Sequence, residues 1–98
     1  MKRRNFRSED HLNHVRAQSC CECGAYPSRA CHLRIGTDGG MGLKPSDYFT
    51  TPMCDTCHGR QHTGERTFWQ GKDPLAIIEA LIRTSPVRRE IEAHRNEN

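Results

Sequence analysis

The chain has 98 residues, of which 34% are hydrophobic and 28% are charged, so it is long enough for one small domain with a thin core. Its formal net charge of +3 is mild, and no apolar run reaches the length of a membrane-spanning helix, which argues against a membrane protein. Six cysteines are candidates for the metal or disulfide cross-links that stabilise domains of this size.

The first seven residues contain four basic side chains and lead into polar sequence. They predict a flexible basic arm, residues 1–7, that can hold phosphate non-specifically. An export signal needs an apolar core, which this stretch lacks. We therefore expect a cytoplasmic protein whose cysteines bind metal rather than form a secreted disulfide framework.

A short helix is predicted after this arm. Ser8 suits the N-cap position, acidic residues follow in the first turn, and the helix runs to about Gln18. A leucine and a valine three residues apart give it one apolar side. His11 and His14 on this helix are interpreted as surface or edge histidines.

Residues 19–27 are typical of a zinc knuckle. Cys20 and Cys23 have the Cys-x-x-Cys spacing, and Gly24 allows the tight turn that such a knuckle needs. Cys21 would form a poorer chelate with Cys23, so it is interpreted as a buried or free thiol.

A strand is predicted over residues 29–35 because apolar and polar residues alternate there. This alternation places Leu33 and Ile35 on one face and His32 on the other, while Cys31 shares the face of Leu33. The glycine-rich loop that follows lacks the Gly-Lys-Ser/Thr ending of a P-loop and is interpreted as a long turn.

A second Cys-x-x-Cys pair occurs about thirty residues after the first, which favours zinc. A short β-prone run leads into this pair, and a helix is expected to start near Thr56 and to end at Gly64. The ligands expected for a closed structural zinc site are Cys20, Cys23, Cys54 and Cys57.

The same helix carries a second ligand spacing. His58 and His62 are four residues apart and therefore share one helix face, whereas the sulfur of Cys57 points elsewhere. Two histidines on one face can hold a second ion with positions left open to water and phosphate. His32 on the neighbouring strand can then serve as a general base, because imidazole titrates near neutral pH.

Two further helices are predicted near the end of the chain. Phe68 and Trp69 are expected to be core residues. An Asp-Pro pair starts the most apolar helix, and a Ser-Pro pair repeats this start signal before the last helix. One domain is thus expected over residues 1–98, with a zinc-stapled core over 20–70 and C-terminal helices over 74–95.

Several of these motifs, in this order, resemble the HNH endonuclease superfamily. They are the run Pro27-Ser28-Arg29-Ala30-Cys31-His32-Leu33-Arg34, the stretch from Gly39 to Asp47, and Cys54-x-x-Cys57-His58-x-x-x-His62 with Phe68-Trp69. The likeness covers about residues 10–70 and is closest to small phage and prophage HNH-like proteins. It implies an α+β fold, namely a zinc-stabilised ββα-metal (HNH/His-Me finger) core with flanking helices.

The resemblance also implies an activity and roles for particular residues. His32 would be the general base of a DNA endonuclease or nickase, and His58 and His62 would hold one catalytic ion such as Mg²⁺ or Mn²⁺. Cys31 stands where the family usually has His or Asp, and it either ligates that ion or packs in the core. The family's orienting Asn is not evident, and Asp47 is the first choice to hold His32 in its place.

Two other functions remain open from the sequence. The chain could be a non-catalytic zinc module that binds nucleic acid, which Cys31 and the missing Asn favour, or a zinc domain that binds a protein. Cut-site preference and oligomeric state are not predicted.

Overall fold

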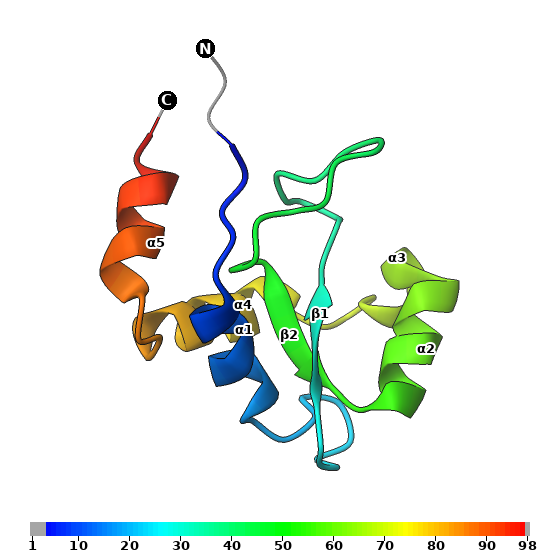
Figure 1. Ribbon diagram of the computed structural model, residues 1–98. Coiled ribbons are helices and arrows are strands. Elements are labelled where there is room, and N and C mark those ends of the chain that lie inside the picture. Colours follow the sequence, from blue (N-terminus) through cyan, green and yellow to red (C-terminus); the bar gives the residue numbers. More distant parts are fainter. Residues whose placement is uncertain (1–3, 98) are drawn as a thin grey trace.

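The computed structural model describes residues 4–97. Its elements are α1 (Glu9–Arg16), β1 (Arg29–His32), β2 (Thr50–Met53), α2 (Asp55–Thr63), α3 (Glu65–Phe68), α4 (Pro74–Arg83) and α5 (Arg88–Arg95). Figure 1 shows the two strands in the middle, with α1 and α4 on one side and α2 and α3 on the other. The fold is a small α+β arrangement, which confirms the predicted fold class. No helix among residues 4–97 is long and apolar enough to cross a membrane.

The two strands form an antiparallel pair in which His32 faces Thr50 and Arg29 faces Met53. All residues of β2 are buried, because helices pack on both faces of the sheet. β1 ends at His32, earlier than the predicted strand over residues 29–35. The Leu33 amide still donates to the Phe49 carbonyl. Beyond it, the amides of residues 34 and 35 donate to the Glu65 carboxylate rather than to another strand, so the strand pairing ends there.

The helix starts follow the predicted caps. The Ser8 hydroxyl accepts the amide of His11 at 3.2 Å, and the Asp73 carboxylate accepts the amide of Ala76 at 3.1 Å. α5 begins at Arg88, slightly later than the Ser-Pro signal indicates. There the Ser85 hydroxyl is within hydrogen-bond distance of His11 Nδ1 and the amide of residue 87.

The core lies between the sheet and the helices and confirms the predicted burial of Phe68 and Trp69, which are 8% and 7% exposed. Its other large members come from α1, the strand region, α4 and α5; they are Val15, Leu33, Tyr48, Met53, Ile78 and Ile91.

Two expectations about the N-terminal part are wrong. His11 is fully buried rather than on the surface. The segment 4–7 is not a free arm, because the amide of Phe6 donates to the Ser46 hydroxyl and the amide of Asp47 donates to the Phe6 carbonyl. Residues 1–3 of the predicted arm lie outside the described part of the chain.

Candidate metal centre and active site

Four cysteines come together from two distant parts of the chain. The Sγ atoms of Cys20, Cys23, Cys54 and Cys57 all lie within 4.8 Å of one another, and those of Cys23 and Cys54 are 3.6 Å apart. Four sulfurs around a tetrahedral zinc with Zn–S bonds of about 2.3 Å are separated by about 3.8 Å. The donor set and its spacing therefore fit a metal such as zinc, as the Cys-x-x-Cys pairs predict.

Local backbone geometry explains how the first pair is presented. Gly24 adopts φ +79°, its amide donates to the Cys20 carbonyl at 2.9 Å, and the Cys20 amide donates to the carbonyl of residue 25. This is the predicted tight turn, which glycine adopts without strain. The second pair begins at Cys54, the N-cap residue of α2, and Cys57 follows in the first turn of that helix.

The four thiols do not ionise alike when no cation is bound. Burial alone would raise the pKa of Cys20, but backbone hydrogen bonds, including those from Cys23 and Cys54, outweigh it and lower the pKa to about 6. Burial and the neighbouring thiols raise the pKa of Cys57 to about 12. A bound cation would favour the thiolate form of all four side chains.

The predicted histidines lie around a second feature, a cavity of about 460 Å³ between β1, the loop after it and α2. His32, His58 and His62 line this cavity, together with Ala30, Cys31, Arg34, Lys44, Pro45, Gln61 and Glu65. Among residues 4–97, the four cysteines are the group of three or more possible metal ligands whose donor atoms lie close together. The ring nitrogens of the three histidines do not form such a group.

His32 is held by Asp47, the residue that the sequence offered first. His32 Nε2 lies 2.9 Å from Asp47 Oδ1, and the Asp47 side chain is 5% exposed. A carboxylate only accepts hydrogen bonds, so this contact assigns the ring proton to Nε2 and leaves Nδ1 as the basic nitrogen. Burial lowers the pKa of His32, and the bond with Asp47 opposes that effect. The ring is therefore neutral near pH 7, as a general base requires.

His58 and His62 share one face of α2, with ring centroids 5.4 Å apart. His58 is half-buried and His62 is exposed. Burial, followed by the charge of His62, lowers the pKa of His58, which favours the neutral form that binds metal. The pair offers two nitrogen ligands to an ion in the cavity.

Cys31 is 1% exposed and belongs to the hydrophobic core. Burial raises the pKa of its thiol to about 12, so it is a neutral, apolar-like side chain at neutral pH. Of the two roles open for Cys31, this environment favours packing in the core over ligation of an ion.

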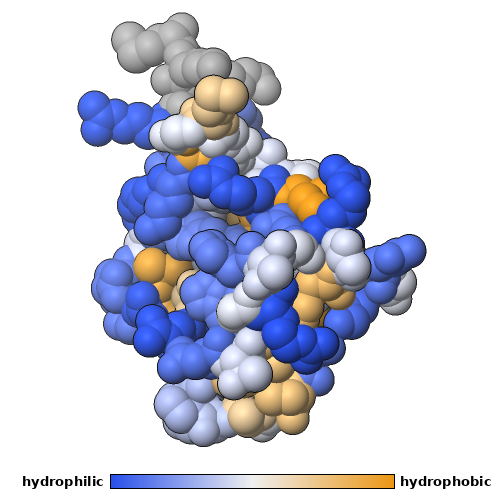
Figure 2. All heavy atoms as spheres, turned by 90° about the vertical axis from the view of Figure 1, so that its right-hand side faces the viewer, coloured by the Kyte–Doolittle hydropathy of each residue, from blue (hydrophilic) through white to orange (hydrophobic). Residues whose placement is uncertain are grey.

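The surface around the cavity is polar and carries exposed basic side chains. Figure 2 shows the face formed by α2 and α3, which is mostly hydrophilic. The exposed basic residues near the two sites in sequence are Arg29, Arg34, Lys44, Arg60 and Arg66. Of these, Arg34 and Lys44 line the cavity, whereas Arg60 and Arg66 line other cavities. Arg29 pairs with Asp55. Basic side chains around a cavity attract anions such as phosphate.

Comparison with known proteins gives a family but no activity. The family described as "Protein of unknown function (DUF968)" matches residues 1–83. The chain belongs to the DUF968 family. It is also 36% identical over 67 residues to "Uncharacterized protein YdfU" of Escherichia coli (strain K12), a match that covers 68% of this chain and 19% of that protein. The chain thus spans about a fifth of the length of that relative. No solved structure matches it significantly.

The sequence did not predict a role for three residues within the DUF968 match: Gln61 and Glu65, which line the cavity, and Arg7, which lies outside it. Arg7 reaches the Asp47 carboxylate from the N-terminal segment, and Glu65 accepts the two amides beyond β1. Gln61 is buried in α2, where its Oε1 accepts the indole N–H of Trp69 at 3.2 Å. The available signal for Gln61 was its i, i+3 spacing from His58 on α2. Glu65 begins α3, beyond the end of α2 at Thr63, so helical spacing gave no signal for it.

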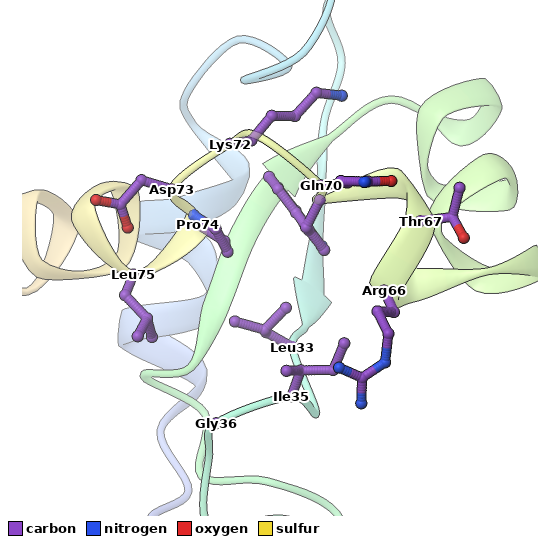
Figure 3. A pocket seen from close by; sticks show the side chains of 11 residues that line it. Leu33, Ile35, Gly36, Arg66, Thr67, Gln70, Lys72, Asp73, Pro74 and Leu75 are labelled. Carbon is purple, nitrogen blue, oxygen red and sulfur yellow. The ribbon is translucent and has the colours of Figure 1, made fainter.

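Another cavity of this DUF968 chain, of about 600 Å³, lies on the opposite side of residues 33–35. Figure 3 shows Leu33, Ile35, Pro74 and Leu75 around it, with Arg66 at its edge. Its walls are largely apolar, and its one carboxylate, Asp73, caps α4. Among residues 4–97, no histidine or cysteine lines this cavity, so the histidine-lined cavity is the better candidate for an active site.

Proposed function

We propose that this chain is a metal-dependent HNH-type endonuclease or nickase that hydrolyses DNA phosphodiester bonds on a zinc-stabilised ββα-metal core. The observation that carries the proposal is the pairing of His32 with Asp47 at 2.9 Å, at the end of β1 and in the cavity that His58 and His62 also line. The chain order β1, β2, α2 around this cavity supports the same superfamily.

His32 acts as the general base. With its proton on Nε2, directed to Asp47, its Nδ1 accepts the proton of the water that attacks phosphorus. The resulting imidazolium is stabilised by the buried Asp47 carboxylate beside it. Lys44 and Arg34 at the same cavity attract the phosphate of the DNA backbone. By the superfamily resemblance, the products carry a 5′-phosphate and a 3′-hydroxyl.

His58 and His62 would hold the catalytic ion, a divalent cation such as Mg²⁺ or Mn²⁺. Such an ion would polarise a phosphoryl oxygen and stabilise the leaving oxygen. Two imidazoles on one helix face fit this role, because they occupy two coordination positions and leave the others for water and phosphate. The four-cysteine cluster would hold zinc, which would join the knuckle before β1 to the start of α2 and so fix His32 relative to His58.

A non-catalytic zinc module that binds nucleic acid is the second candidate. Two observations favour it: the three imidazoles line the cavity without forming a tight ligand group, and Cys31 is buried where the superfamily usually has another ligand. Basic side chains around the cavity suit either function.

A nicking assay separates the two candidates. Zinc-loaded protein is incubated with supercoiled plasmid and Mg²⁺, Mn²⁺ or Ni²⁺, and the wild type is compared with His32→Ala. Loss of a general base lowers the rate by about 10²- to 10⁴-fold. His14→Ala is the matched control, because His14 contacts Thr84 Oγ1 and does not line the cavity.

Undiminished nicking by His32→Ala would remove the base assignment. DNA binding without nicking in any of the three ions would favour the non-catalytic module. Zinc content and circular dichroism of each variant show that the fold is intact.

A further inference from the structure

The Asp47 carboxylate is buried and is shared between three partners. Its Oδ1 contacts His32 Nε2 at 2.9 Å and accepts Arg7 Nη1 at 3.4 Å, while its Oδ2 accepts the amide of Ser8 at 2.9 Å. A buried carboxylate is costly unless charge and hydrogen bonds compensate for lost water. Two of the three compensating groups come from the N-terminal segment rather than from the strands or α2.

Arg7 also fixes the loop that carries Asp47. Its Nη1 donates to the carbonyls of Pro45 at 2.6 Å and Phe6 at 3.0 Å, and its Nη2 donates to the carbonyl of Lys44 at 2.9 Å. The planar guanidinium presents several donors in a fixed geometry, so one side chain can hold several acceptors at once. A lysine or glutamine cannot reproduce this set.

The backbone of the N-terminal segment is bonded to the same loop. The Phe6 amide donates to Ser46 Oγ at 2.9 Å, the Asp47 amide donates to the Phe6 carbonyl at 2.8 Å, and Asn5 Nδ2 donates to the Lys44 carbonyl at 2.9 Å. Figure 1 shows this segment running from the N-terminal end down to α1, past the loop above the strands.

We propose that Arg7 is a positioning residue for the proposed active site, acting through Asp47 on His32. Arg7, with the Ser8 amide, holds Asp47 so that its Oδ1 keeps the His32 ring proton on Nε2 and leaves Nδ1 as the base. The consequence for catalysis rests on the proposed endonuclease function, whereas the effect on the His32 ring does not. Besides Asp47, the charges of Lys44 and Arg7 act on the ring, and Arg34, His58, His62 and Glu65 line the same cavity.

The test uses the full zinc-loaded chain and two readouts. The first is the His32 tautomer, measured from the ¹⁵N chemical shifts of the ring at neutral pH. The second is the steady-state nicking of plasmid DNA. Arg7→Gln is expected to convert a single Nε2–H tautomer into a mixture and to lower kcat by about 10- to 100-fold, with KM changed little, because a misplaced catalytic group loses rate rather than affinity.

Arg4→Gln is the matched control. It removes the same charge from the same segment, and Arg4 is exposed and makes no contact with Asp47 among the described residues. We expect it to keep the wild-type tautomer and kcat. Arg7→Lys keeps the charge but not the fork of donors, so it is expected to give an intermediate tautomer ratio and kcat.

An unchanged His32 tautomer in Arg7→Gln would refute the positioning role, whatever happens to nicking. Equal losses in Arg4→Gln and Arg7→Gln would also refute it, because they would indicate loss of charge for DNA binding. If Arg7→Gln does not fold, a wild-type tautomer in Arg7→Lys refutes the role instead. If the wild type nicks no DNA while Arg7→Gln still shifts the tautomer, the endonuclease proposal fails and the positioning role stands.

Discussion

His11 makes the stability of this protein sensitive to mild acid. Its side chain is fully buried, its Nδ1 lies 2.8 Å from Ser85 Oγ, and its Nε2 has no hydrogen-bond partner among the described residues. Burial, reinforced by His14 and opposed by Asp47, lowers the pKa of His11 to about 4. An unfolded histidine has a pKa of about 6.5. Between these values the unfolded chain binds a proton at this position and the folded chain does not.

The sign and size of the effect follow from proton linkage. Because the folded pKa lies below the unfolded one, the stabilisation is complete above the unfolded pKa and is lost as pH falls toward the folded pKa. For pKa values of about 6.5 and about 4, lowering the pH from about 7.5 to about 5.5 costs about 1.3 kcal/mol. Below both values the cost reaches about 3 kcal/mol.

The assay is urea unfolding at these two pH values, followed by the fluorescence of Trp69, which is the one tryptophan of the chain. His11→Gln removes the titrating ring but keeps a polar group near Ser85, and we expect it to lose about 1.3 kcal/mol of the wild-type pH dependence. His14→Gln removes a neighbouring imidazole and should retain most of that dependence, because burial is the larger cause of the lowered pKa of His11. The zinc site is the same in all three proteins, so its own response to acid cancels. Equal pH dependence in His11→Gln and the wild type would refute the reasoning.

Two further predictions concern the cysteines. Cys54→Ser should unfold much of the domain and abolish stoichiometric zinc binding, since a structural zinc contributes on the order of 10 kcal/mol to folding in small domains; a near-native melting curve would contradict this. Cys31→Ala should lower the free energy of unfolding by on the order of 1 kcal/mol, because it trims one buried side chain, and should leave plasmid nicking intact. A loss of nicking in a folded Cys31→Ala protein would instead make the thiol a ligand of the catalytic ion.

The local signals in the sequence predicted local structure well. Ser8 caps α1, Asp73 caps α4, and the turn at Gly24 presents the first cysteine pair. The two Cys-x-x-Cys pairs also predicted that the four cysteines come together, because two such pairs at this separation are typical of a tetrahedral zinc site. The caps and the turn depend on neighbouring residues in the chain, and the cysteine cluster depends on the affinity of thiolates for metal.

The missed features depend on partners far away in the chain. The sequence predicts His11 as a surface or edge histidine, yet it is fully buried, lies four residues before the buried Val15 and contacts Ser85, 74 residues away. Its helical spacing from Val15 was the available signal. The ordering of residues 5–7 had no such signal, because their bonds to the loop at residues 44–47 follow no helical or strand period. The contact between His32 and Asp47 was accessible from the sequence only through the superfamily resemblance.

The buried carboxylate of Asp47 explains why the N-terminal segment is bonded to the rest of the fold. A neutral amide can orient an imidazole through its carbonyl oxygen without burying charge, whereas the side chain of Asp47 is a carboxylate and is 5% exposed. Unpaired, such a group costs several kcal/mol. The Arg7 guanidinium and the Ser8 amide supply the compensation. Arg7, one of the basic residues of the predicted free arm, therefore compensates the charge of Asp47 within the fold. We expect the loop, His32 and the N-terminal segment to become ordered together.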